Sequence, residues 1–188
     1  LRFSTTTNWF IGRVTVAGVP EPPNRGQLAN ATKLELGQDF ETSAVRQAAE
    51  NLKTRLEANG LFEARIDSAL DYDAPTEQVS VDFRVDPGPR AKLATPAITG
   101  IPDAMLDAFV RTTHWKRWWG WLGWYPVSEQ RVQNGLERVR RAYVKKDYLL
   151  NRVTLDSLDY DATDQVARPK ISVNLGPKVE IRARGAKV

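Results

Sequence analysis

The chain of 188 residues carries 27 Lys and Arg against 23 Asp and Glu and is 41% hydrophobic, which excludes a disordered or fibrous protein. The absence of cysteine excludes disulfides and thiolate metal sites, and a single histidine leaves little room for histidine-based catalysis or zinc binding, so we expect neither an enzyme nor a bound cofactor. The net charge of +4 is uneven, because residues 1–90 hold 10 basic and 13 acidic groups whereas residues 91–188 hold 17 and 10.

The first 90 residues predict a strand, two helices and two further strands, in that order. A strand ending at Gly18 precedes a short helix around 24–33 and a longer helix whose apolar residues recur with helical spacing. The longer helix should end at the Asn-Gly pair at 59–60, which is typical of a left-handed C-cap, and an alternating strand over 62–71 should follow at once. A second alternating strand then ends before Gly88.

The same order of elements recurs in the second half of the chain. A strand ending at Gly100, a helix over 102–112, a long amphipathic helix and two alternating strands are predicted there. Three short segments recur 87 or 88 residues apart: Leu-Asp-Tyr-Asp at 70–73 and 158–161, Gln-Val at 78–79 and 165–166, and Gly-Pro at 88–89 and 176–177. We therefore expect an α+β protein of tandem βααββ modules, each a three-stranded mixed sheet covered on one face by two helices.

The repeat also sets the predicted domain boundaries. The first unit spans residues 1–90 and the second spans 91–177. Residues 178–188 should form the first strand of a third, truncated unit, because Val179–Gly185 repeats the pattern of a strand ending in glycine. Since the chain also begins with Leu rather than Met, we expect it to be a fragment of a longer array.

These features together resemble the POTRA family, the polypeptide-transport-associated domains that precede the β-barrel of outer-membrane assembly and translocation proteins. The resemblance depends on the strand ending in Gly18, the turn over 34–40, the helix exit over 52–62 and the closing strand over 81–89. It implies a periplasmic module that binds unfolded polypeptides transiently by β-augmentation, as a chaperone does, and that is tethered to the outer membrane through a β-barrel outside this chain. It further implies that the protein is not an enzyme.

The resemblance also names partners and a binding surface. The implied partners are unfolded outer-membrane proteins or secreted polypeptide, the protein's own C-terminal β-barrel and accessory periplasmic lipoproteins. The implied binding surface is the edge formed by the second strand of each unit, because an unpaired edge can accept an extended client. The predicted edge residues are Phe62, Ala64, Ile66, Ser68, Leu70, Leu150, Val153, Leu155 and Ser157.

A Trp-rich insert over 114–126 separates the two predicted helices of the second unit, where the family has a short turn. One interpretation is that its rings form a hydrophobic cap on a small domain. The other is that the insert is exposed and contacts a partner or a membrane surface, since Trp with Lys and Arg is typical of such boundaries. The candidate contact residues are Trp115, Lys116, Arg117, Trp118, Trp119, Trp121 and Trp124.

A nucleic-acid-binding function is the alternative hypothesis. The order βααββ also occurs in KH domains, and Gly120–Gly123 matches the GXXG pattern with which those domains clamp a nucleic-acid backbone. The long helix of the second unit carries a basic face formed by Arg138, Arg141, Lys145 and Lys146. Trp and Leu are unusual in a phosphate-binding loop, and the first unit has no GXXG, so we expect polypeptide rather than nucleic acid as the partner.

A pair of acids recurs at the end of each predicted edge strand: Asp71 with Asp73 in the first unit, and Asp159 with Asp161 in the second. Close carboxylates can act in acid-base catalysis or bind a cation. Since both pairs lie between two alternating strands, we interpret them instead as hairpin residues that cap turns. His114 is interpreted as a residue at a helix C-terminus rather than as a metal ligand.

Overall fold

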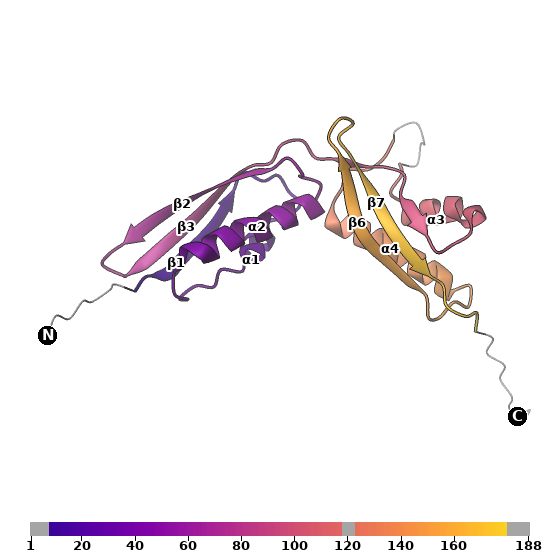
Figure 1. Cartoon of the computed structure of the whole chain (residues 1–188), viewed down its shortest axis with the longest axis horizontal. Helices are drawn as coiled ribbons and strands as arrows, with labels where there is room; N and C mark the ends of the chain where they lie inside the picture. The colour runs from indigo at the N-terminus through magenta and orange to yellow at the C-terminus, as the bar shows by residue number, and fades with distance from the viewer. Residues whose placement is uncertain (1–7, 118–122, 180–188) are drawn as a thin grey trace, which may run out of the picture. The chain divides into compact units, whose positions relative to one another are not determined.

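Figure 1 shows the computed structural model, which describes residues 8–117 and 123–179. The chain divides into two compact units, residues 1–90 and 91–188. In each unit two helices lie against a β-sheet, which confirms the predicted α+β class. The strand predicted to begin a third unit lies outside the described residues, except for Val179.

The first unit contains a three-stranded mixed sheet. Its elements are β1 (Phe10–Ala17), α1 (Arg25–Thr32), α2 (Thr42–Ala58), β2 (Arg65–Asp73) and β3 (Gln78–Asp86). The strand order is β1-β3-β2, in which β1 is parallel and β2 antiparallel to β3. Parallel strands need a crossover connection, and the segment that contains α1 and α2 provides it.

The core of the first unit lies between its sheet and its helices. A capping box starts α1: the backbone N–H of Gln27 donates to the Asn24 side chain, and the backbone N–H of Asn24 donates to the Gln27 side chain. α2 and β3 supply apolar residues with helical and alternating spacing, and these side chains are buried. The core consists of Val16, Leu28, Val45, Ala48, Leu52, Leu56, Leu61, Val81, Phe83 and Val85.

The second unit repeats this plan with an interrupted first strand. Its elements are β4 (Lys92–Leu93), β5 (Ala97–Thr99), η1 (Asp103–Met105), α3 (Leu106–Thr113), α4 (Glu129–Val144), β6 (Arg152–Asp161) and β7 (Val166–Asn174). β6 pairs with β7 along its whole length, so β4 and β5 share the other side of β7, to which both are parallel. The gap between them falls beside Pro169 of β7, which has no N–H to donate.

The pairing register confirms that the two sheets are equivalent. The pairs Phe10↔Gln78 and Ala17↔Arg84 of the first sheet correspond to Lys92↔Val166 and Thr99↔Ser172 of the second. β4 and β5 together are therefore the counterpart of β1. The internal repeat seen in the sequence is thus a repeat of backbone pairing.

A glycine with positive φ follows the first strand in each unit. The φ angles are +94° at Gly18 and +86° at Gly100. A Cβ on Gly18 would overlap the carbonyl oxygen of Val85 and lie 3.1 Å from its carbon, and a Cβ on Gly100 would meet Val173 in the same way, at 3.0 Å from the carbonyl carbon. Only glycine fits at these two positions, because both the backbone angle and the close approach exclude a side chain.

Three element boundaries differ from those predicted. The strand expected over 62–71 begins only at Arg65, and the equivalent strand, expected to include Leu150, begins only at Arg152. In each case the preceding helix is followed by a residue with positive φ and a short turn. Phe62, Ala64 and Leu150 therefore precede the strands to which we had assigned them. The helix expected over 102–112 begins as the 3-10 turn η1.

None of the helices in the described ranges is both long enough and apolar enough to span a bilayer. In the same part of the chain, the Asp, Glu and His side chains form no group of three or more that could hold a metal ion.

Candidate functional site

In the first unit, β2 forms an open edge of the sheet: among the described residues, its outer side has no strand partner along its whole length. It pairs with β3 alone. The opposite edge, β1, is partly covered by the turn between the helices, where the N–H groups of Ile11, Gly37 and Phe40 donate to the carbonyls of Gln38, Ile11 and Trp9 at 2.9, 2.7 and 2.7 Å. β2 is therefore the edge to which an extended segment can add.

In the second unit, β6 is the corresponding edge, because among the described strands it pairs with β7 alone. The start of the opposite edge is covered by the end of the Trp-rich insert. The N–H of Leu93 donates to the carbonyl of Tyr125, and the N–H of Val127 donates to the carbonyl of Ala91, each at 2.9 Å. This cover was not predicted, since the insert lacks the alternating pattern that would indicate a strand.

The predicted edge residues that lie inside the strands differ in exposure. They are Ile66, Ser68 and Leu70 of β2 and Val153, Leu155 and Ser157 of β6. Ile66 and Leu70 are half-buried and pack against the core of the first unit, whereas Ser68 is exposed. Val153 is 1% exposed, and its backbone carbonyl already accepts hydrogen bonds of 3.2 and 2.5 Å from the guanidinium of Arg140.

The paired acids lie at the ends of the β2–β3 and β6–β7 hairpins, as predicted. Asp73 ends β2 and accepts a hydrogen bond of 2.7 Å from the Thr76 hydroxyl. Asp161 ends β6 and accepts a hydrogen bond of 2.9 Å from the backbone N–H of Thr163. The second acid of each pair therefore makes a turn-capping contact.

Trp115 is a core residue, so its assignment to a partner-contact surface was wrong. Its side chain is fully buried, and its Nε1–H donates to the carbonyl of Arg131 at 3.1 Å. The ring lies against Gly135 of α4, where a Cβ would be 2.6 Å from Cε2 of Trp115. The preceding residue, His114, is exposed and is the C-cap of α3 with φ +56°, as its interpretation as a helix-end residue requires.

The rest of the described insert is a short two-stranded extension stabilised by cation–π contacts. Lys116 forms a β-bridge with Trp124, and its ammonium lies 5.9 Å from the centre of that ring. The guanidinium groups of Arg117 and Arg131 lie 5.4 and 5.0 Å from the ring centre of Tyr125. The candidate contact residues Trp118, Trp119 and Trp121, and all of the GXXG segment except Gly123, lie outside the described residues.

The predicted basic face on α4 is only partly free. Arg138 donates to the carbonyl of Thr113 at the end of α3, so it joins the two helices. Arg141 pairs with Glu137 at 3.0 Å, and this contact lowers the pKa of Glu137. Lys145 and Lys146 are exposed. Arg138 and Arg141 are therefore engaged within the unit, and the two exposed lysines follow the last residue of α4, Val144, so the predicted face is not a continuous row of free cations on the helix.

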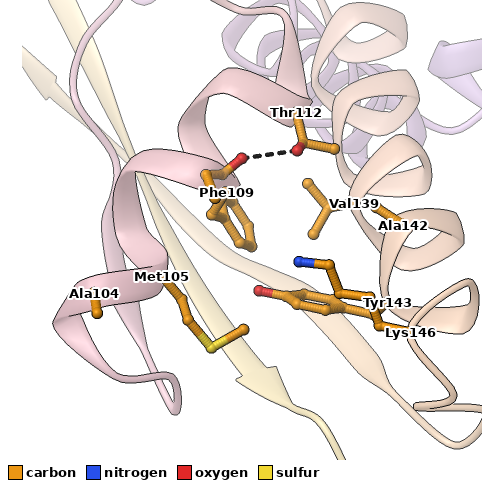
Figure 2. A pocket seen from close by; sticks show the side chains of 9 residues that line it. Ala104, Met105, Phe109, Thr112, Val139, Ala142, Tyr143 and Lys146 are labelled. Carbon is orange, nitrogen blue, oxygen red and sulfur yellow. Dashed lines mark hydrogen bonds between the residues drawn. The ribbon is translucent and has the colours of Figure 1, made fainter.

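A small groove lies between α4 and the segment formed by η1 and α3 (Figure 2). Its volume is about 180 Å³, and its walls are mostly apolar, with the Tyr143 hydroxyl and the Lys146 ammonium directed into it. Burial raises the pKa of Tyr143. Pockets for drug-sized molecules measure about 300–1,000 Å³, so this groove has room for a side chain rather than for a cofactor.

Comparison with known proteins gives one family match. Residues 10–88 match the POTRA family model, described as the surface antigen variable number repeat. A search of curated proteins gives no match.

Several solved structures are similar to the chain. POTRA domains 3–5 of BamA from Haemophilus influenzae are 14% identical with a TM-score of 0.49, over 93% of this chain and 69% of that one. POTRA domains 1–2 of the periplasmic domain of Omp85 from Anabaena are 18% identical with a TM-score of 0.45, over 94% and 100%. CdiB from Acinetobacter baumannii is 11% identical with a TM-score of 0.36, over 92% and 30%.

Proposed function

We propose, from the premise that residues 10–88 form a POTRA domain, that this chain is the polypeptide-binding part of an outer-membrane protein assembly or translocation machine. Residues 91–177 act as a second domain of the same kind, and residues 178–188 begin a third. Unfolded clients add transiently, by β-augmentation, to an open sheet edge of these domains. The binding is non-covalent and needs neither a catalytic group nor a cofactor.

The observation that carries this proposal is the open edge of β2. Its nine residues pair with β3 on one side, and along the other side no backbone hydrogen bond from the described residues covers them. Main-chain hydrogen bonds to such an edge hold an added strand whatever its sequence, because every residue except proline supplies the same donor and acceptor. Weak, sequence-tolerant binding suits the hand-over of many different clients.

The proposed location and partners follow from the family. The Omp85 domains named above are described as periplasmic, and we place this chain in the periplasm on that analogy. Its partners are then unfolded outer-membrane proteins or secreted polypeptide, a β-barrel of the same protein, accessory lipoproteins and the membrane surface. The half-buried side chains Ile66 and Leu70 support an apolar client, because an added strand would lie beside them and cover them further.

A peptide titration followed by amide NMR tests this function. A nine-residue peptide that alternates Val and Thr should shift the amides of Arg65–Asp73 or of β6, because an added strand hydrogen-bonds to those groups. A single-stranded RNA should leave these amides unchanged. Shifts confined to Lys145 and Lys146 with RNA, and none with the peptide, would contradict the proposal and favour the nucleic-acid alternative.

A matched pair of proline variants locates the contact. Successive N–H groups of an edge strand point alternately to its neighbour and to solvent, so only one of Ser68→Pro and Ala69→Pro removes an outward donor. That variant should keep the unfolding midpoint of the first unit and lose peptide binding at β2. If both variants fold and both still bind the peptide at β2, the result would argue against strand addition.

A further inference from the structure

The two open edges are not equivalent, because β6 contains one residue more than β2. β2 has nine residues in unbroken register with β3. β6 has ten residues against the nine of β7, and its register shifts between Leu155 and Ser157. The extra residue, Asp156, forms a bulge, and its carboxylate accepts a hydrogen bond from Ser172 of β7.

A bulge in an edge strand hinders the addition of another strand. It breaks the regular spacing of donors and acceptors and increases the local twist, and natural proteins use bulges to protect exposed edges. In the first unit the equivalent segment, Ser68 followed by Ala69, continues the ladder without interruption. The backbone geometry therefore favours β2 over β6 as the edge that accepts a partner.

The outward face of β2 carries negative charge that is unneutralised toward the hairpin end of the strand, because Asp67 lies opposite Arg84 of β3 whereas Asp71 and Asp73 have no such cation. Asp67, Ala69, Asp71 and Asp73 alternate along this face and are exposed. Asp71 lies opposite Ser80 of β3 and Asp73 lies opposite Gln78, neither of which is a cation. Neither Asp71 nor Asp73 forms an ion pair with any residue that the structure describes.

On the corresponding face of β6, the sheet itself neutralises Asp159, whereas Asp161 lies opposite Val166. Asp159 lies opposite Arg168 of β7 and forms an ion pair of 2.6 Å with Lys170. The hydrogen bond from Lys170 lowers the pKa of Asp159. The first unit has Asp82 where the second has Lys170, so the same motif is left without a cation there. The first unit therefore offers both a regular edge and two carboxylates, Asp71 and Asp73, that form no ion pair with the described residues.

We propose that β2 is the preferred polypeptide-binding edge of this chain and that it takes an extended segment alternating between apolar residues and Lys or Arg. The inference rests on the proposed function and names its site and its substrate class. In an added strand, one set of alternate side chains would lie beside Ile66 and Leu70 on the helix side of the sheet, and the other set would lie beside Asp71 and Asp73. Apolar groups fit the first position and cations fit the second.

Two peptides that differ only in charge test this inference on the full 188-residue chain. One alternates Val with Lys and the other alternates Val with Glu. Amide NMR should show shifts along β2 and not along β6, with the Lys peptide binding about tenfold more tightly at low salt. The double variant Asp71→Lys with Asp73→Lys should abolish or reverse this preference.

The second unit supplies the matched controls. The double variant Asp159→Lys with Asp161→Lys should leave the affinity for the Lys peptide unchanged, because those acids lie on the bulged edge. Deletion of Asp156 should restore a regular register to β6 and produce shifts there that the parent chain does not show. Comparison of β7 amide protection with that of the parent checks that the deletion variant is folded.

The possible outcomes separate this inference from the proposed function. Equal shifts along both edges, or equal affinity for the two peptides, would overturn the choice of β2 and of a basic client while leaving β-augmentation in place. If neither charged peptide nor the Val-Thr peptide shifts any amide of β2 or β6, the proposed function and this inference would both be overturned.

Discussion

Gly18→Ala should destabilise the first unit by about 3 kcal/mol and leave the second unit unaffected. The substitution forces an L-residue to adopt φ +94° and places a Cβ against the carbonyl oxygen of Val85 in β3. Hydrogen exchange measures the effect unit by unit, and protection of the β3 amides should fall about a hundredfold while that of the β7 amides is retained. Gly100→Ala should produce the opposite pattern, because its Cβ would meet Val173 of β7.

Gly37→Ala is the control that separates the two causes. Gly37 has a similar φ of +83°, but a Cβ there would have no neighbour within 4 Å. Gly37→Ala should therefore lower the stability of the first unit only by the backbone strain, about 1 kcal/mol. Equal losses for Gly18→Ala and Gly37→Ala would show that the close approach to Val85 contributes nothing, and would contradict the account of these glycines as packing requirements.

The order of elements and most of the core could be predicted from the sequence, because a helix or strand that is buried on one face has apolar residues at a regular spacing along the chain. The stripe of Val45, Leu52 and Leu56 on α2 shows this period of 3.6. The alternation of Val81 and Phe83 on β3 shows the period of two. These residues are buried in the structure, since the helix and the strand each bury one face against the other.

The surface of the second unit could not be predicted in the same way. Composition indicates that a Trp-rich segment is apolar, but it does not distinguish a ring that is buried from one that contacts a partner. The covering of β4 by Tyr125 and Val127 also has no periodic signal, because only a few backbone hydrogen bonds are involved. A missed signal did exist for the bulge, since Arg65 and Arg152, which begin the two edge strands, are 87 residues apart, whereas the Leu-Asp-Tyr-Asp segments within those strands are 88 apart.

The internal repeat, compared in the structure, explains why Trp115 is a core residue. Leu34 is its equivalent in the first unit: the backbone N–H of each donates to a buried threonine hydroxyl, Thr32 in the first unit and Thr113 in the second, at 3.3 Å. Ala48 of α2 is likewise equivalent to Gly135 of α4. The pair Leu with Ala in the first unit has thus become Trp with Gly in the second, so a larger ring faces a smaller helix residue.

This exchange of volume predicts strong coupling between Trp115 and Gly135. Trp115→Leu should cost about 2 kcal/mol, because it leaves a cavity and removes the hydrogen bond to Arg131. Gly135→Ala should cost about as much despite the better helix propensity of alanine, because its Cβ would overlap the indole. The double variant recreates the Leu–Ala pair and should lose less than either change alone.

A double-mutant cycle measured by β7 amide protection gives the coupling free energy, which should be about 2 kcal/mol or more in favour of the double variant. Substitution of Trp124 by Leu is the matched control, because that ring is half-buried and forms a cation–π contact with Lys116. It should show no coupling to Gly135→Ala. Additive losses for Trp115 and Gly135 would mean that the two residues do not share one packing site, and would contradict the placement of the indole against α4.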